Sequence, residues 1–75
     1  MLAIKDIINR DPEIFGGEPV FAGTRVPVKF LFMHLRKGIP MDEFLEGFPT
    51  VSRAQAEAVI ELAEHHIEDW YESAA

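Results

Sequence analysis

The chain has 75 residues, 48% of them hydrophobic, with six Phe, one Trp, one Tyr, no cysteine and a formal net charge of −6. This size permits one small domain with a modest core, and the apolar composition argues against disorder. The lack of cysteine excludes disulfides and thiolate metal sites. With no long apolar run and no signal peptide, we expect a cytoplasmic protein without membrane contact.

The charge divides unevenly along the sequence. Residues 1–37 carry six Lys or Arg and four Asp or Glu, a net +2, whereas residues 38–75 carry one Arg and nine Asp or Glu, a net −8. Because phosphate binding needs positive charge, the C-terminal half is poorly suited to hold nucleic acid. The split favours a basic protein as the partner of that half.

The first nine residues leave helix and strand in competition. Ile4, Ile7 and Ile8 have helical spacing, but the run is short and its side chains are β-branched. Asp11-Pro12 ends the run, because the residue before a proline avoids the helical region.

The stretch FGGEPVFAGTRVPV, residues 15–28, predicts a rigid β-hairpin. Residues 19–21 and 25–27 are two short strands, and Gly23 between them is free to take the positive φ of a tight turn. We assign seven residues to this structural motif: Gly16, Gly17, Pro19, Gly23, Thr24, Arg25 and Pro27. We expect them to build the fold or a dimer contact rather than to bind a ligand directly.

Two helices are expected in the middle of the chain. Apolar side chains recur at i, i+3, i+4 and i+7 over residues 28–37, at Val28, Leu31, Phe32 and Leu35. Gly38 follows this helix as a stop signal. A shorter helix begins near Asp42, whose charge suits a helix N-terminus, and ends at Gly47 and Pro49.

A longer helix follows. Ser52 is its expected cap, and Gln55 three residues later completes a capping-box signature. From there the helix can extend to about Glu72, roughly 31 Å at the usual rise per residue. A tight turn between the last two helices is typical of a helix-turn-helix arrangement.

We therefore expect a mainly α fold in one domain, residues 1–75. Residues 1–27 form an N-terminal segment with a short β-hairpin. Residues 28–72 form a three-helix bundle of the homeodomain-like or winged-helix-like helix-turn-helix type.

The last helix carries a row of carboxylates. A step of about 100° per residue aligns Glu57, Glu61, Glu64, Glu68 and Glu72 on one face. Neighbours in the row repel by about 0.2–0.5 kcal/mol per pair, and the helix has no lysine to relieve them. Two interpretations stay open, a solvated face or a docking surface for a basic protein.

The end of the same helix is apolar on its other side. Ile67, Trp70 and Tyr71 come so late in the chain that a small domain has little core left to cover them. Large aromatic residues at such a position are typical of an interface. We therefore favour a partner or dimer contact over core packing for these three residues.

The sequence gives little support for a metal site or a catalytic site. His65 and His66 are adjacent and point about 100° apart, so they cannot share an ion as an i,i+4 pair would. Ser52 is explained as a cap, and no nucleophile has a base at a recognised spacing. Gly16-Gly17 matches neither the GK[ST] phosphate loop nor GxGxxG. We expect no catalytic residue, no metal and no cofactor.

DNA contact would depend on few side chains. Arg53 and Gln55 lie near the start of the last helix, and a dimer would contribute basic residues of the first half twice. The candidate DNA-binding residues are Arg53, Gln55, Lys29, Arg36 and Lys37.

Four motifs stand in order in this short chain: DPEI at residues 11–14, GGEPV at 16–20, GTRVPV at 23–28 and FPTVS at 48–52. With them, residues 9–63 resemble the family catalogued as domain of unknown function 433 (DUF433). This resemblance implies a homeodomain-type bundle behind a short β element and a tendency to form homodimers. It also implies an antitoxin of a type II toxin–antitoxin pair, which binds and silences a PIN-like nuclease toxin.

We accordingly predict an antitoxin-like protein. Ile67, Trp70, Tyr71 and the row of Glu57, Glu61, Glu64 and Glu68 would lead the contact with a PIN-like toxin. Repression of the shared operon through operator DNA is compatible with this role. The alternative is a helix-turn-helix transcriptional regulator without a toxin partner.

Overall fold

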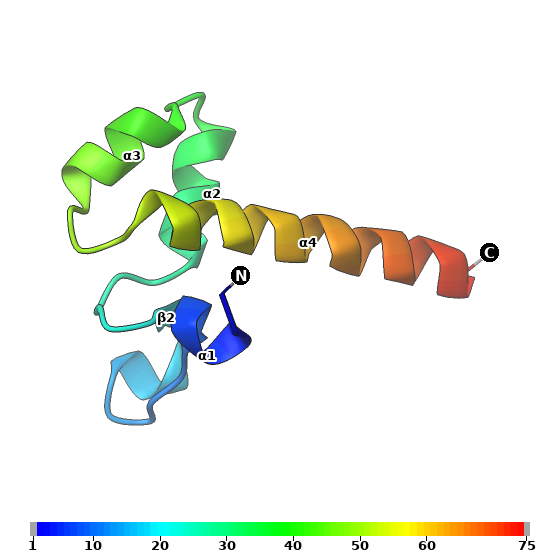
Figure 1. Ribbon diagram of the computed structural model, residues 1–75, viewed down its shortest axis with the longest axis horizontal. Coiled ribbons are helices and arrows are strands. Elements are labelled where there is room, and N and C mark those ends of the chain that lie inside the picture. The colour runs from blue at the N-terminus through cyan, green and yellow to red at the C-terminus, as the bar shows by residue number, and fades with distance from the viewer. Residues whose placement is uncertain (1, 75) are drawn as a thin grey trace.

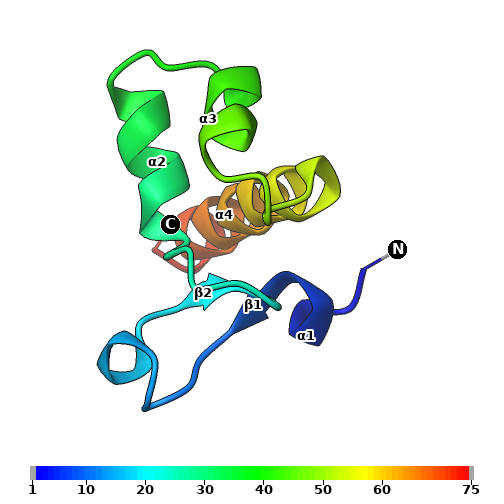
Figure 2. The ribbon, with the colours of Figure 1, turned by 90° about the vertical axis from the view of Figure 1, so that its left-hand side faces the viewer.

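The computed structural model describes residues 2–74, so that Met1 and Ala75 lie outside it. Within this range the elements are α1 (Ile4–Ile7), β1 (Ile8–Asn9), η1 (Phe15–Gly17), β2 (Val20–Phe21), α2 (Lys29–Arg36), α3 (Met41–Gly47) and α4 (Arg53–Ala74). The expected mainly helical class with a short N-terminal β element is confirmed (Figure 1). The start of α4 runs between the α2–α3 pair and the N-terminal segment (Figure 2).

The N-terminal residues adopt both of the conformations that were in competition. One helical turn, α1, leads directly into β1, which pairs antiparallel with β2 in the register Ile8↔Phe21 and Asn9↔Val20. The amide of Ala22 donates to the carbonyl of Ile7 at 2.9 Å and extends this pairing by one bond. The two-stranded sheet therefore joins segments that are far apart in the sequence.

The hairpin expected within residues 19–27 needs a correction. Residues 25–27 do not form a strand, although Val20 and Pro27 make one isolated antiparallel bridge. Two backbone hydrogen bonds flank this bridge, from the amide of Phe21 to the carbonyl of Val26 and from the amide of Val28 to the carbonyl of Pro19, both at 3.0 Å. The amide of Val26 donates to Thr24 Oγ1 at 3.0 Å instead of to the opposite segment. The Thr24 side chain thus ends the ladder beside the turn, and the regular partner of β2 is β1. The tight turn itself is present, with Gly23 at φ 77°.

Phe44 of α3 lies at the centre of the core and is fully buried. Its ring centroid is 5.0 Å from that of Phe48, 5.3 Å from His34 and 6.1 Å from Phe21. The other buried members of this cluster are Ile7, Phe21, Leu31, Val51, Ala56 and Val59. The apolar stripe expected on α2 contributes in part, since Leu31 is fully buried but Leu35 is 36% exposed.

α4 is the longest element and extends beyond the core. Its first turn has the expected capping box, in which the amide of Gln55 donates to Ser52 Oγ at 3.0 Å and the amide of Ser52 donates to Gln55 Oε1 at 3.1 Å. Buried residues of α4 end at Val59, and every residue from 64 to 74 is exposed. This segment, which we call the arm, covers about three turns and about 16 Å (Figure 1).

Candidate functional site

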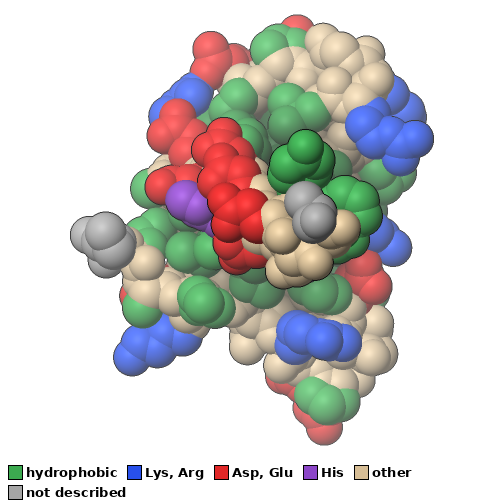
Figure 3. Space-filling model, turned by 90° about the vertical axis from the view of Figure 1, so that its right-hand side faces the viewer, with side chains coloured by type: hydrophobic (Ala, Val, Ile, Leu, Met, Phe, Trp, Pro, Cys, Tyr) green, Lys and Arg blue, Asp and Glu red, His purple; other side chains and the backbone are tan. Residues whose placement is uncertain are grey.

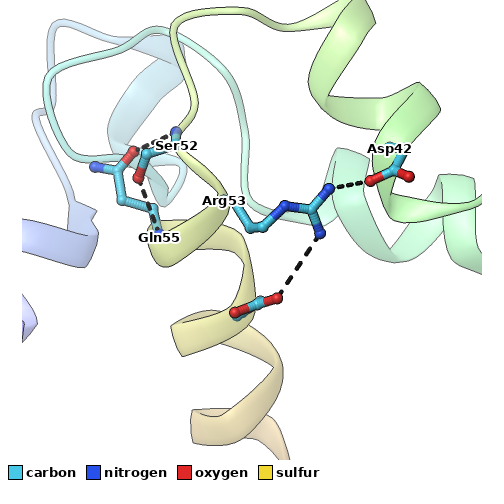
Figure 4. A network of polar contacts seen from close by, with 5 residues as sticks. Asp42, Ser52, Arg53 and Gln55 are labelled. Atoms are coloured by element: carbon cyan, nitrogen blue, oxygen red, sulfur yellow. Dashed lines mark hydrogen bonds and ion pairs between the residues drawn. The ribbon is translucent and has the colours of Figure 1, made fainter.

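The side chain of Gln55 makes three hydrogen bonds within the fold. Its Nε2 donates to the carbonyl of Asp6 and to the carbonyl of Ala22, both at 3.0 Å, while its Oε1 caps Ser52. One amide thus joins the start of α4 to α1 and to the turn after β2, while Figure 4 shows its reciprocal bonds with Ser52. Because both amide hydrogens are used, Gln55 has no free donor for a base edge.

Gln55→Ala should lower the free energy of unfolding by about 2 kcal/mol, since it removes three hydrogen bonds that each contribute about 1 kcal/mol or less. Urea unfolding followed by circular dichroism measures this loss. Glu57→Ala, an exposed change two residues along the same helix, is the control and should have little effect. Equal midpoints for the two variants would show that the bridge from Gln55 does not stabilise the fold.

Arg53 and Lys29 are paired with carboxylates. Arg53 contacts Asp42 of α3 through Nη2, and its Nη1 lies 3.8 Å from Glu57 Oε1 (Figure 4). Lys29 Nζ lies 3.3 Å from Glu18 Oε1. Two of the four candidate DNA-binding cations are therefore partly neutralised within the chain.

The remaining two candidate cations, Arg36 and Lys37, are exposed and lie at the end of α2 that is remote from Lys29. The five predicted DNA-binding residues thus do not form one patch of free donors. A DNA-binding surface would need to be assembled from separate places on the fold.

The carboxylates predicted as a row are exposed along α4. His65 lies beside this row, with Nε2 at 3.9 Å from Glu61 Oε1 and Nδ1 at 4.0 Å from Glu68 Oε2. Seen along the helix from its C-terminal side, acidic side chains gather on one side of the arm and hydrophobic side chains on the other (Figure 3). The arm is therefore amphipathic although it touches no core.

The large apolar residues of the arm are exposed to solvent. Ile67, Trp70 and Tyr71 are 63%, 65% and 67% exposed. Ile67 lies four residues after Ala63, and Trp70 lies three residues after Ile67, so they continue the apolar stripe of Ile60 and Ala63 that is partly buried nearer the core. A stripe that runs past the core without a covering surface is typical of an interface.

The Gly-Gly pair closes a tight left-handed turn. Gly16 and Gly17 have φ values of 66° and 94°, and Phe15 before them has a φ of 50°. Arg10 Nε holds the turn by donating to the carbonyl of Gly17 at 2.7 Å. Sequence analysis predicted the role of the glycines but missed Phe15, which is 62% exposed in a conformation that side chains rarely adopt.

An apolar hollow of about 360 Å³ lies between this turn and the helices. Its apolar lining consists of Phe15, Val26, Pro27, Phe30 and Phe48. Its polar margin consists of Glu18, Arg25 and Lys29. Glu18 and Lys29 pair with each other, whereas no ion pair involves Arg25 among the described residues. We call this feature the Arg25 hollow.

Within residues 2–74, no group of three or more His, Cys, Asp or Glu is placed to hold a metal ion. No helix in the same range is long and apolar enough to cross a membrane.

Comparisons with known proteins agree with the fold. The family described as "Protein of unknown function (DUF433)" matches residues 8–63. The uncharacterized protein y4eO of Sinorhizobium fredii (strain NBRC 101917 / NGR234) is 35% identical over 51 residues, which are 68% of this chain but only 23% of that protein. The crystal structure of a DUF433 member from Anabaena variabilis ATCC 29413 superposes with a TM-score of 0.71 at 26% identity, covering 88% of this chain and 65% of the other.

Proposed function

The chain belongs to the DUF433 family, and we propose that it is an antitoxin-like binding protein which neutralises a basic, PIN-like nuclease toxin. The observation that carries this proposal is the arm. Eleven consecutive helical residues, 64–74, lie outside the core and combine an acidic face with three exposed large apolar side chains. Such a segment is suited to a helix-in-groove contact with another protein.

The apolar face and the acidic face of the arm would contribute to binding in different ways. Ile67, Trp70 and Tyr71 would be the apolar anchors, because large aromatic residues dominate the binding energy of protein interfaces. Glu64 and Glu68, with Glu57 and Glu61 nearer the core, would face the cations with which a nuclease holds its phosphate backbone. Charge complementarity of this kind raises the rate of association and excludes the competing nucleic acid. The chain itself would act by occupying the groove and not as an enzyme.

A co-purification experiment tests the proposal. The tagged chain is expressed together with the open reading frame beside its gene, and the mass of the eluted material is measured by light scattering. We expect a complex of defined mass whose second component arrests growth when it is expressed alone. A chain that elutes without its neighbour, combined with a harmless neighbour, would overturn the proposal.

The alternative role, a helix-turn-helix regulator that binds operator DNA, has weaker support. Gln55 is used by the fold, and Arg53 and Lys29 have carboxylate partners. Binding through Arg36 and Lys37 of two subunits would depend steeply on salt. Absence of a retarded complex with upstream DNA at low salt would exclude this role.

A further inference from the structure

We infer that the Arg25 hollow is a binding site for the arm of a second copy of this chain. The occupant is a helix end that carries large apolar side chains beside carboxylates, which the second copy supplies through Trp70, Tyr71 and Glu68. This inference concerns the chain by itself and does not depend on the proposed toxin.

The first argument is chemical complementarity. The hollow offers an apolar floor, with three phenylalanine rings among its lining residues, and the Arg25 guanidinium at its margin. The arm offers exposed aromatic rings, and Glu68 lies one helical turn before Tyr71. A volume of about 360 Å³ suits one or two aromatic side chains rather than a whole helix. Apolar burial and one charge pair would therefore form together.

The second argument is the geometry of Phe15. Its φ of 50° is unfavourable for a residue with a side chain, and the ring is 62% exposed. The two glycines that follow it, both at positive φ, and the bond from Arg10 to the carbonyl of Gly17 hold the turn in this conformation. Folding alone gains little from an exposed ring in a strained backbone, whereas a binding site gains a preformed wall.

The third argument is that the arm cannot reach the hollow of its own chain. α4 is one continuous helix from Arg53 to Ala74. The arm extends away from the globule, while the turn at residues 15–17 lies at the opposite end of the molecule (Figure 1). The contact must therefore form between two chains.

Pairing of two arms with each other is disfavoured by charge. The arm carries Glu64, Glu68, Asp69 and Glu72, with no Lys or Arg. Two arms packed through their apolar faces would combine eight negative charges in one pair of helices with no Lys or Arg to balance them, and these charges repel one another. The Arg25 hollow presents the opposite sign, so the arm-to-hollow contact is the favourable one.

Trp70 is the only tryptophan of the chain and therefore reports on the contact directly. On raising the concentration of the purified chain, we expect its mass in sedimentation to increase and its tryptophan emission to shift to the blue. Arg25→Glu should raise the dissociation constant by about tenfold or more, and Trp70→Ala by about thirtyfold. Arg36→Glu makes the same change of charge at an exposed site outside the hollow and should leave association unchanged.

A mixing experiment distinguishes arm-to-hollow contact from arm-to-arm contact. Arg25→Glu retains a normal arm, and Trp70→Ala retains a normal hollow, so one complete contact forms between the two variants. We expect their mixture to associate and to show the blue shift, which only the Arg25→Glu chain can emit. The inference is overturned if the wild-type chain stays monomeric with exposed tryptophan, if Arg25→Glu associates like the wild type, or if the mixture does not associate.

Discussion

Replacing Trp70 and Tyr71 together with alanine should weaken binding of the toxin-like partner by about a hundredfold or more. Each truncated aromatic anchor at an interface typically costs about 2 kcal/mol or more, and about 1.4 kcal/mol corresponds to a tenfold change in affinity. Both side chains are about two-thirds exposed on the arm, so their loss opens no cavity in the core. Isothermal titration calorimetry of the co-purified partner with each form of the chain measures the change.

Met33→Ala is the matched control for this double variant. Met33 is a large apolar side chain that is 44% exposed and belongs to α2, not to the arm. We expect its truncation to leave the affinity unchanged. All three proteins should have the same thermal unfolding midpoint within about 3 °C, because exposed truncations change stability by about 0.5 kcal/mol or less. Wild-type affinity in the double variant would show that the arm does not lead the contact.

Phe44→Ala should abolish or severely reduce cooperative folding. Truncating a buried phenylalanine costs about 3–5 kcal/mol, and Phe44 is fully buried against Phe21, His34 and Phe48. A domain of this size has a total stability of only about 4–11 kcal/mol, so the loss is a large part of the whole. Thermal and urea unfolding followed by circular dichroism at dilute concentration measure it.

Phe15→Ala is the control for the core variant, because it makes the same substitution at a phenylalanine that is 62% exposed. Its unfolding midpoint should lie close to that of the wild type, since no buried contact is lost. Similar midpoints for Phe44→Ala and the wild type would contradict the central place of Phe44 in the core.

Local signals in the sequence predicted most of the helical structure. The stripe that includes Leu31 placed α2 within one residue at each end, because helical amphipathicity is a short-range property. The Ser52–Gln55 pair located the start of α4, since a capping box involves residues only three apart. The exposure of Trp70 was also predictable, from its late position in a chain too short to cover it.

Long-range contacts were not predictable from the same signals. No local pattern shows that the Gln55 side chain binds the carbonyls of Asp6 and Ala22, which are 49 and 33 residues away. The pairing of β1 with β2 was not predictable either. Strands of two residues are too short for an alternation of apolar and polar side chains to indicate which strand they pair with. The Arg25 hollow, which joins the turn at residues 15–17 to α2 and Phe48, depends on such contacts as well.

The arm begins where the family match ends, at residue 63. Substitutions in residues 64–74 are free of the packing constraints that restrict the core, so they should cost little in folding. On the proposed role of the arm, the choice of partner could therefore change in evolution while the scaffold stays the same. Grafting the arm of one family member onto another would then be expected to transfer that choice of partner.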